Sequence, residues 1–184
     1  MTTAPTAAIA AIAPTAAIVK SLSNAELLAP VSVRLLADLM IKNGLYLATA
    51  ESCTGGLIAA ACTDLAGSSA WFERGFVSYS NAAKTELLGV DAALIAEYGA
   101  VSEPVARAMA FGAARHSHAQ VSLAVTGVAG PAGGSADKPV GTVWFGFSVN
   151  GTLTSEVMRF GGDRAAVRAA TVLHALNGLV ARLS

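Results

Sequence analysis

The sequence predicts an α/β fold, a three-layer α/β/α sandwich around a mixed, mostly parallel sheet. Segments with helical and with strand patterns alternate along most of the 184 residues, as expected when helices cover both faces of a sheet. Near the end, strand-forming segments at 142–149 and 152–160 flank Asn150-Gly151, a dipeptide that favours a tight hairpin. The alternation predicts the parallel part of the sheet, and the hairpin adds an antiparallel pair.

The first 22 residues differ in composition from the rest of the chain. They are rich in Ala, Thr and Pro and carry no charge before Lys20. Pro5 and Pro14 interrupt the apolar stretch that a secretion signal would keep unbroken, and no stretch is long enough to span a bilayer. We therefore predict a disordered tail over 1–22, a single domain over 23–184 and no association with membranes.

The first half of this domain is predicted to alternate helix and strand. Apolar residues at helical spacing follow Asn24, and Pro30 could kink or divide that helix. A short apolar strand at 45–50 leads into a small-residue helix at 54–62, and β-forming residues predict a strand at 72–80.

The second half continues with three helices, a strand, the hairpin and a final helix. Glycines close the first two of these helices. Ser102, followed by an acid and a proline, is typical of a capped start for the third. The predicted elements are 81–88, 91–98, 102–116, 121–125 and a last helix from about Asp163.

Charge and cysteine content exclude several functional classes. Twelve basic residues balance twelve acidic ones, and no basic run exists, so a general nucleic-acid binder is not expected. Cys53 and Cys62 are the only cysteines, and a domain of this size needs no disulfide, which favours the reducing cytoplasm. No histidine has zinc-like spacing to the cysteines, so we expect no metal site.

The first candidate site is Glu51-Ser52-Cys53-Thr54-Gly55-Gly56, where a predicted strand runs into a helix. Ligands of open α/β sheets bind beyond the carboxyl ends of strands, and a helix N-terminus there favours anions and oxyanions. The hydroxyls of Ser52 and Thr54 could serve as nucleophile or phosphate ligand, and Cys53 is a rival nucleophile. Spacing alone fits simple helix capping equally well.

A second candidate is Ser78-Tyr79-Ser80-Asn81 with Lys84 one turn later. A desolvated lysine with a lowered pKa can act as a general base, and a tyrosine hydroxyl can relay a proton. Taken alone, Tyr79 and Lys84 are better explained as an edge tyrosine and an exposed lysine.

A third candidate is the glycine- and proline-rich loop at 127–139, which follows Thr126. It is too long and too glycine-rich for a plain connection, and its N–H groups could form an anion nest. It lacks the features of a P-loop and of a dinucleotide fingerprint. Downstream, Arg159, Arg164 and Arg168 could reach a phosphate or carboxylate.

Together these segments resemble the CinA C-terminal-domain family over about Asn24 to Leu183. Five motifs in register carry the resemblance. They are Ala50-Glu51-Ser52-Cys53-Thr54-Gly55-Gly56; Tyr79-Ser80-Asn81 with Lys84 and Leu87-Leu88-Gly89-Val90; Gly99-Ala100-Val101-Ser102; Thr126-Gly127-Val128-Ala129-Gly130-Pro131 with Gly133-Gly134 and Lys138-Pro139-Val140-Gly141-Thr142; and Phe160-Gly161-Gly162-Asp163-Arg164 with Val167-Arg168.

Stand-alone members of that family are nicotinamide mononucleotide deamidases of the PncC type. The resemblance therefore implies an amidohydrolase of pyridine nucleotide salvage that converts nicotinamide mononucleotide to nicotinate mononucleotide and ammonia, without a cofactor. It implies Ser52 as nucleophile in preference to Cys53, with Tyr79 and Lys84 as proton-transfer partners. The residues implied to hold substrate and oxyanion are Glu51, Thr54, Gly55, Gly56, Thr126, Gly127, Gly130 and Gly133, with Arg164 for the phosphate.

Three points stay open in the sequence. Glu51 could orient Lys84 or only pack at the strand end. The chain could be a non-catalytic module that binds a mononucleotide or a protein partner, or an amidohydrolase with another substrate. Family members often self-associate, so we expect a homo-oligomer, although no residue pattern specifies its interface.

Overall fold

The computed structural model describes residues 24–184, with side chains from residue 31 onward, so the predicted tail over 1–22 lies outside it. Helices and strands alternate as the sequence predicts. In chain order they are α1 (Asn24–Lys42), β1 (Leu47–Glu51), α2 (Leu57–Thr63), the 3₁₀ turn η2 (Ser68–Ala70), β2 (Phe72–Val77), α3 (Asn81–Leu88), α4 (Ala92–Tyr98), α5 (Glu103–Arg115), β3 (Val121–Gly127), β4 (Thr142–Val149), β5 (Thr152–Arg159) and α6 (Arg164–Leu183).

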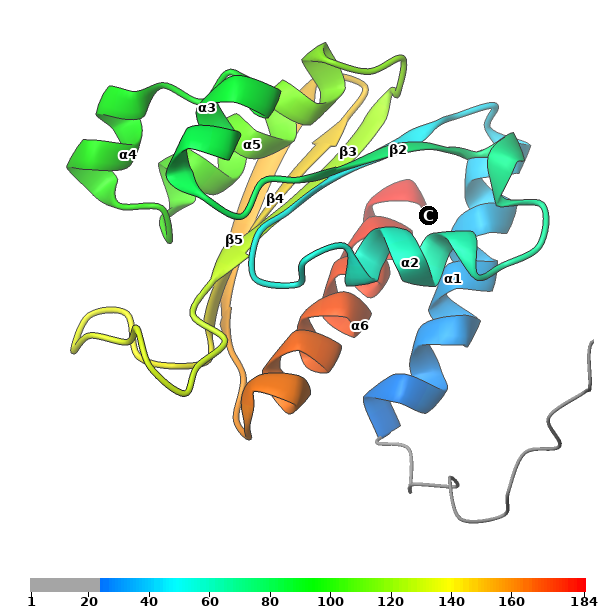
Figure 1. Ribbon diagram of the computed structural model, residues 1–184. Helices are drawn as coiled ribbons and strands as arrows, with labels where there is room; N and C mark the ends of the chain where they lie inside the picture. Colours follow the sequence, from blue (N-terminus) through cyan, green and yellow to red (C-terminus); the bar gives the residue numbers. More distant parts are fainter. Residues whose placement is uncertain (1–23) are drawn as a thin grey trace, which may run out of the picture.

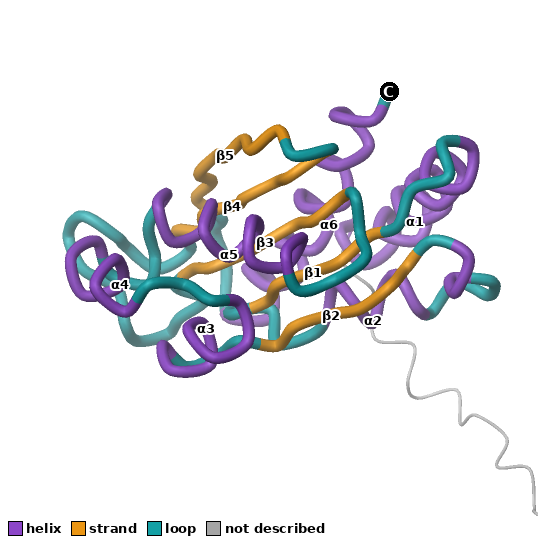
Figure 2. Tube along the Cα trace, turned by 90° about the horizontal axis from the view of Figure 1, so that it is seen from above, coloured by secondary structure: helices purple, strands orange, loops and turns teal. Residues whose placement is uncertain are grey.

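The five strands form one mixed sheet in the order β2-β1-β3-β4-β5. Strand β1 runs parallel to both of its neighbours, β4 runs antiparallel to β3, and β5 runs antiparallel to β4. Helices α3, α4 and α5 cover one face, whereas α1, α2 and α6 cover the other (Figure 1). Figure 2 looks onto the first of these faces. The predicted three-layer sandwich is confirmed.

The two faces of the sheet bury side chains of different size. Large residues point toward α1 and α6, and small ones toward α5, as the two-residue period of strands allows. The large set includes Leu47, Leu123, Phe145 and Phe147, and the small set Ala48, Ala50, Ala124 and Gly146. A Cβ on Gly146 would lie 2.3 Å from the Ala106 oxygen, so the small residues let α5 lie directly on the strands.

A second close approach joins α5 to α3. A Cβ on Gly112 would lie 2.0 Å from the main-chain oxygen of Leu88, the last residue of α3. Only glycine fits at this contact, which sets how closely the two helices pack.

Several local predictions are confirmed. Helix α3 has the predicted bounds, and the hairpin turns at Asn150 and Gly151, whose φ angles of 48° and 84° are both positive, as a tight hairpin turn of this type requires. Asp163 caps α6 by accepting a hydrogen bond from the Ala166 N–H. No helix within residues 24–184 is long and apolar enough to cross a membrane.

Other local predictions need correction. Helix α2 begins at Leu57 rather than Thr54, because Gly55 and Gly56 have positive φ angles that a right-handed helix excludes. Helix α1 is continuous through Pro30. Ser102 precedes α5, but its hydroxyl donates to the Gly99 oxygen and caps no helical N–H.

Candidate active site

The candidate residues gather where β1, β2 and β3 end, beside the N-terminus of α6. Ser52 follows β1, Tyr79 follows β2, and Thr126 lies near the end of β3. Because these three strands are parallel neighbours, their carboxyl ends meet at one edge of the sheet. Lys84 reaches this edge from the first turn of α3.

Ser52 and Lys84 form the centre of the site. The Lys84 Nζ lies 3.1 Å from the Ser52 Oγ, 2.9 Å from the Ser78 main-chain oxygen and 3.3 Å from the Tyr79 main-chain oxygen. The Lys84 side chain is only 1% exposed, and no ion pair in the described part of the chain includes it. Burial therefore lowers the pKa of the Lys84 amine.

Glu51 is equally buried but is saturated with hydrogen bonds. Its carboxylate accepts the main-chain N–H groups of Gly56, Ile58 and Ala59 and the hydroxyl of Thr54, at 2.7–3.0 Å. These donors open α2, so Glu51 caps a helix from the preceding strand. The sequence left two roles open for Glu51, orienting Lys84 or packing at the strand end. No hydrogen bond joins Glu51 to Lys84 in residues 24–184, so the structure agrees better with packing at the strand end.

Burial distinguishes the two rival nucleophiles. It raises the pKa of Cys53 to about 11, outweighing the lowering by the main-chain N–H groups of Cys53 and Thr54. The Cys53 thiol therefore stays protonated near neutral pH. Burial also raises the pKa of Cys62, and both cysteines are free thiols.

The N–H groups of the turn are more engaged than the sequence suggests. The Ser52 N–H donates to the Val125 oxygen, the Gly55 N–H to the Ser52 oxygen, and the Gly56 N–H to the Glu51 carboxylate. The expectation that Gly55 and Gly56 offer free donors does not fit these bonds. Their positive φ angles shape the turn.

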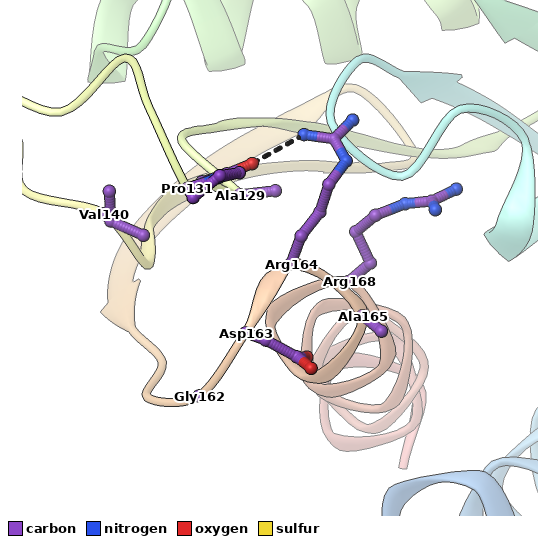
Figure 3. A pocket seen from close by; sticks show the side chains of 9 residues that line it. Ala129, Pro131, Val140, Gly162, Asp163, Arg164, Ala165 and Arg168 are labelled. Carbon is purple, nitrogen blue, oxygen red and sulfur yellow. Dashed lines mark hydrogen bonds between the residues drawn. The ribbon is translucent and has the colours of Figure 1, made fainter.

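Two arginines of α6 lie over this edge, beside a cavity of about 640 Å³ (Figure 3). Arg164 donates to the Gly130 oxygen at 3.0 Å and to the Tyr79 hydroxyl at 3.2 Å. Arg168 donates to the Thr54 oxygen at 2.8 Å, and its buried Nε has no hydrogen-bond partner among the described residues. The cavity walls are Ala129, Gly130, Pro131, Val140, Gly162, Asp163, Arg164, Ala165 and Arg168.

The remaining predicted residues differ in their distance from the centre. The Thr126 hydroxyl donates a hydrogen bond to the Ala100 main-chain oxygen. Gly127 packs so tightly that a Cβ there would lie 2.7 Å from the Val143 side chain. Gly130 lines the cavity, but Gly133 is exposed and lies outside its walls. The sequence indicated Arg168 only as one of three arginines that could reach an anion. Its spacing of four residues from Arg164 could have singled it out, because that spacing places both side chains on one side of α6.

No cluster of three or more His, Cys, Asp or Glu side chains that could hold a metal occurs in the described residues. What the site does contain is a buried serine–lysine pair, an arginine-lined cavity and a glycine-rich loop. These are groups suited to nucleophilic attack and to binding an anion.

Comparison with known sequences gives a consistent result. The pattern of the CinA C-terminal domain matches residues 31–183. The "Nicotinamide-nucleotide amidohydrolase PncC" of Enterobacter agglomerans is 58% identical over 138 residues, covering 74% of this chain and 84% of that protein. The protein of the same name from Escherichia coli K12 is 52% identical over 137 residues, or 74% and 83% of the two chains. A "CinA-like protein" of Geobacter sulfurreducens is 54% identical over 148 residues, 80% of this chain but 36% of its own length.

Solved structures give the same assignment. A CinA superfamily protein of Klebsiella pneumoniae superposes with a TM-score of 0.82 at 38% identity, covering 84% of this chain and 97% of that one. A competence/damage inducible protein of Agrobacterium tumefaciens gives 0.76 at 48% identity, with coverage of 82% and 94%. The chain belongs to the CinA C-terminal domain family.

Proposed function

We propose that this chain is an amidohydrolase that converts nicotinamide mononucleotide to nicotinate mononucleotide and ammonia, with Ser52 as nucleophile. The observation that carries the proposal is the 3.1 Å contact between the Ser52 Oγ and the buried amine of Lys84. The names of the relatives from Enterobacter agglomerans and Escherichia coli supply the substrate class.

The surroundings of Lys84 suit a general base. A neutral amine has two N–H groups and one lone pair. The Ser78 and Tyr79 carbonyls can accept both N–H groups, which turns the lone pair toward the Ser52 hydroxyl. Because burial lowers the Lys84 pKa, the amine can be neutral when substrate binds and can remove the Ser52 proton.

The reaction then proceeds in two stages. Ser52 Oγ attacks the carboxamide carbon, and the C–N bond breaks as the nitrogen leaves with its electron pair and takes the proton held by Lys84. Water then attacks the acyl-enzyme while Lys84 accepts the water proton, and Lys84 returns that proton to the Ser52 Oγ as the ester C–O bond breaks. The Gly55 and Gly56 N–H groups are engaged within the turn, so we assign the oxyanion to the Thr54 N–H, which lies against the Cys53 sulfur in the resting site.

The cavity beside α6 supports binding of the substrate phosphate. Arg164 and Arg168 supply two positive charges at its wall, where the N-terminus of the 20-residue α6 also lies. We assign the phosphate to both arginines rather than to Arg164 alone. The Tyr79 hydroxyl contacts Arg164, so its predicted proton-transfer role would require the phenol to turn toward Lys84.

Release of ammonia from nicotinamide mononucleotide by the purified protein tests the proposal. Ser52→Ala should lower kcat by on the order of 10⁴-fold or more, as loss of a nucleophile does. Cys53→Ala is the matched control at the adjacent position and should keep activity within a few-fold, because its thiol is protonated. Near-full activity of Ser52→Ala would refute the mechanism.

The same assay distinguishes the rival functions. A non-catalytic binding module would bind the mononucleotide but release no ammonia from it. An amidohydrolase with another substrate would release ammonia from a different amide in a substrate panel and not from nicotinamide mononucleotide.

A further inference from the structure

Ser78 has a buried hydroxyl that the mechanism above does not use. Its side chain is 0% exposed, and its Oγ has no hydrogen-bond partner among residues 24–184. An unsatisfied buried hydroxyl destabilises the folded state, and folded proteins keep few of them without a reason. Only the main chain of Ser78 has bonds, donating to the Glu51 oxygen and accepting from Lys84.

The strand register places this hydroxyl on the reactive side of the sheet. Glu51 pairs with Val77, and the Ser78 N–H continues the ladder to Glu51, so Ser78 lies beside Ser52. Residues side by side on neighbouring strands point to the same face. Ser52 points toward Lys84 and α3, so Ser78 does too.

During the reaction Lys84 needs one more hydrogen-bond acceptor than it has in the resting site. As an ammonium it has three N–H groups, and its present partners are the Ser78 oxygen, the Tyr79 oxygen and the Ser52 Oγ. Once the Ser52 Oγ has attacked the carboxamide carbon it is bonded to that carbon and is a weaker acceptor, while Lys84 holds the Ser52 proton as an ammonium. The third N–H of a buried cation would then lack a partner, which is costly.

We propose that the Ser78 hydroxyl accepts this third N–H in the tetrahedral intermediates, when Lys84 is protonated and the Ser52 Oγ is bonded to carbon, and so serves as a positioning residue for Lys84. This inference rests on the proposed serine mechanism. Ser78 keeps its own proton throughout: Lys84 gives its proton to the departing nitrogen and later receives one from the attacking water. The Ser78 hydroxyl, unpaired in the resting site, thus becomes a hydrogen-bond acceptor only during the reaction.

The first test needs no substrate. Besides burial, the ionisable group that shifts the Lys84 pKa is Cys53. The Glu51 carboxylate is hydrogen-bonded to α2 on the opposite face of the sheet. Cys53→Ala is therefore introduced throughout. The Lys84 pKa is then measured by NMR of ¹³C-labelled lysine, with and without Ser52→Ala and Ser78→Ala.

Losing one acceptor should change the Lys84 pKa little, because the other replaces it. Losing both should lower the pKa by about one pH unit beyond the sum of the single changes, since a hydrogen bond to a charged group is lost. Additive changes would overturn the proposal.

The second test uses turnover. Ser78→Ala should lower kcat about 10-fold with KM nearly unchanged, while Ser78→Thr keeps the hydroxyl and most of the activity. Ser78→Ala should also be as stable as the parent or more so, because it removes an unpaired polar group. Ser122→Ala is the matched control: Ser122 is buried on the same face with its hydroxyl bonded to Ala110, and its loss should cost stability but not kcat.

The outcomes separate the two proposals. If the parent protein releases no ammonia from nicotinamide mononucleotide but the pKa changes are non-additive, the proposed function fails and the Ser78 role stands. If the parent is active while Ser78→Ala leaves kcat unchanged and the changes in the Lys84 pKa are additive, the Ser78 role fails alone.

Discussion

A buried carboxylate at the end of β1 and a buried amine beside the end of β2 are held in opposite ways. Glu51, the last residue of β1, accepts four hydrogen bonds of 3.0 Å or less from the turn that follows and the start of α2. Lys84 has two carbonyls and a hydroxyl around it and no ion pair in the described residues.

This difference teaches how a buried charge relates to function. The Glu51 carboxylate is matched by oriented N–H dipoles, so the side chain serves the architecture. Lys84 is held by neutral groups that suit an amine as well as an ammonium, so its proton can leave. Saturation marks the structural group, and incomplete compensation marks the reactive one.

The largest expected effect comes from removing the Lys84 amine. Lys84→Met should lower kcat/KM by about 10²–10⁴-fold, the usual contribution of a general base, without loss of stability, because a poorly compensated buried cation is removed. Lys84→Arg should not restore activity, since a guanidinium does not deprotonate. Ammonia release and urea unfolding measure both, with Lys42→Met as control; a large loss of stability in Lys84→Met would contradict the comparison.

The next effect concerns Glu51 and falls on stability. Glu51→Gln replaces one acceptor oxygen by a donor that faces the N–H groups of α2. We expect the free energy of unfolding to fall by about 2–3 kcal/mol. Glu86→Gln, an exposed carboxylate change on α3, should alter it little. A fully stable Glu51→Gln with reduced kcat would mean that Glu51 acts in the reaction instead.

The smallest effect is a dependence on pH that Lys84 should confer. Activity needs the neutral amine, so kcat/KM should rise tenfold per pH unit on its acid side and level off below the ordinary lysine pKa of 10.5. Between the lowered folded pKa and 10.5 the unfolded chain binds more protons, so stability should also rise with pH. Lys84→Met should lose that rise in stability, which urea unfolding at several pH values measures.

Much of the architecture could be predicted because its signals are local. The Asn150-Gly151 turn and the bounds of α3 follow from residues next to each other in the chain. The start of α2 could not, because a glutamate in the preceding strand supplies the cap that a nearby side chain usually provides.

For the candidate site, the sequence could indicate residues but not their geometry. Resemblance indicated Ser52 and Lys84, but spacing could not choose between Ser52 and Cys53, because burial of the thiol is a tertiary property. The engagement of the Gly55 and Gly56 N–H groups likewise depends on how the motif folds, because their partners are Ser52 and Glu51 of the same motif. Ser78 belongs to the candidate segment 78–81, but the sequence gives it no role, and only the strand register places it beside Ser52.

Through its contact with Leu88, Gly112 influences the position of Lys84 without touching the candidate site. Lys84 and Leu88 belong to the same two turns of α3, so the depth at which α3 rests on α5 also sets the reach of the lysine. A methyl group at Gly112 would lift α3 and lengthen the distance between the amine and the serine. Mutational tolerance at this distant position is therefore governed by catalytic alignment as well as by packing.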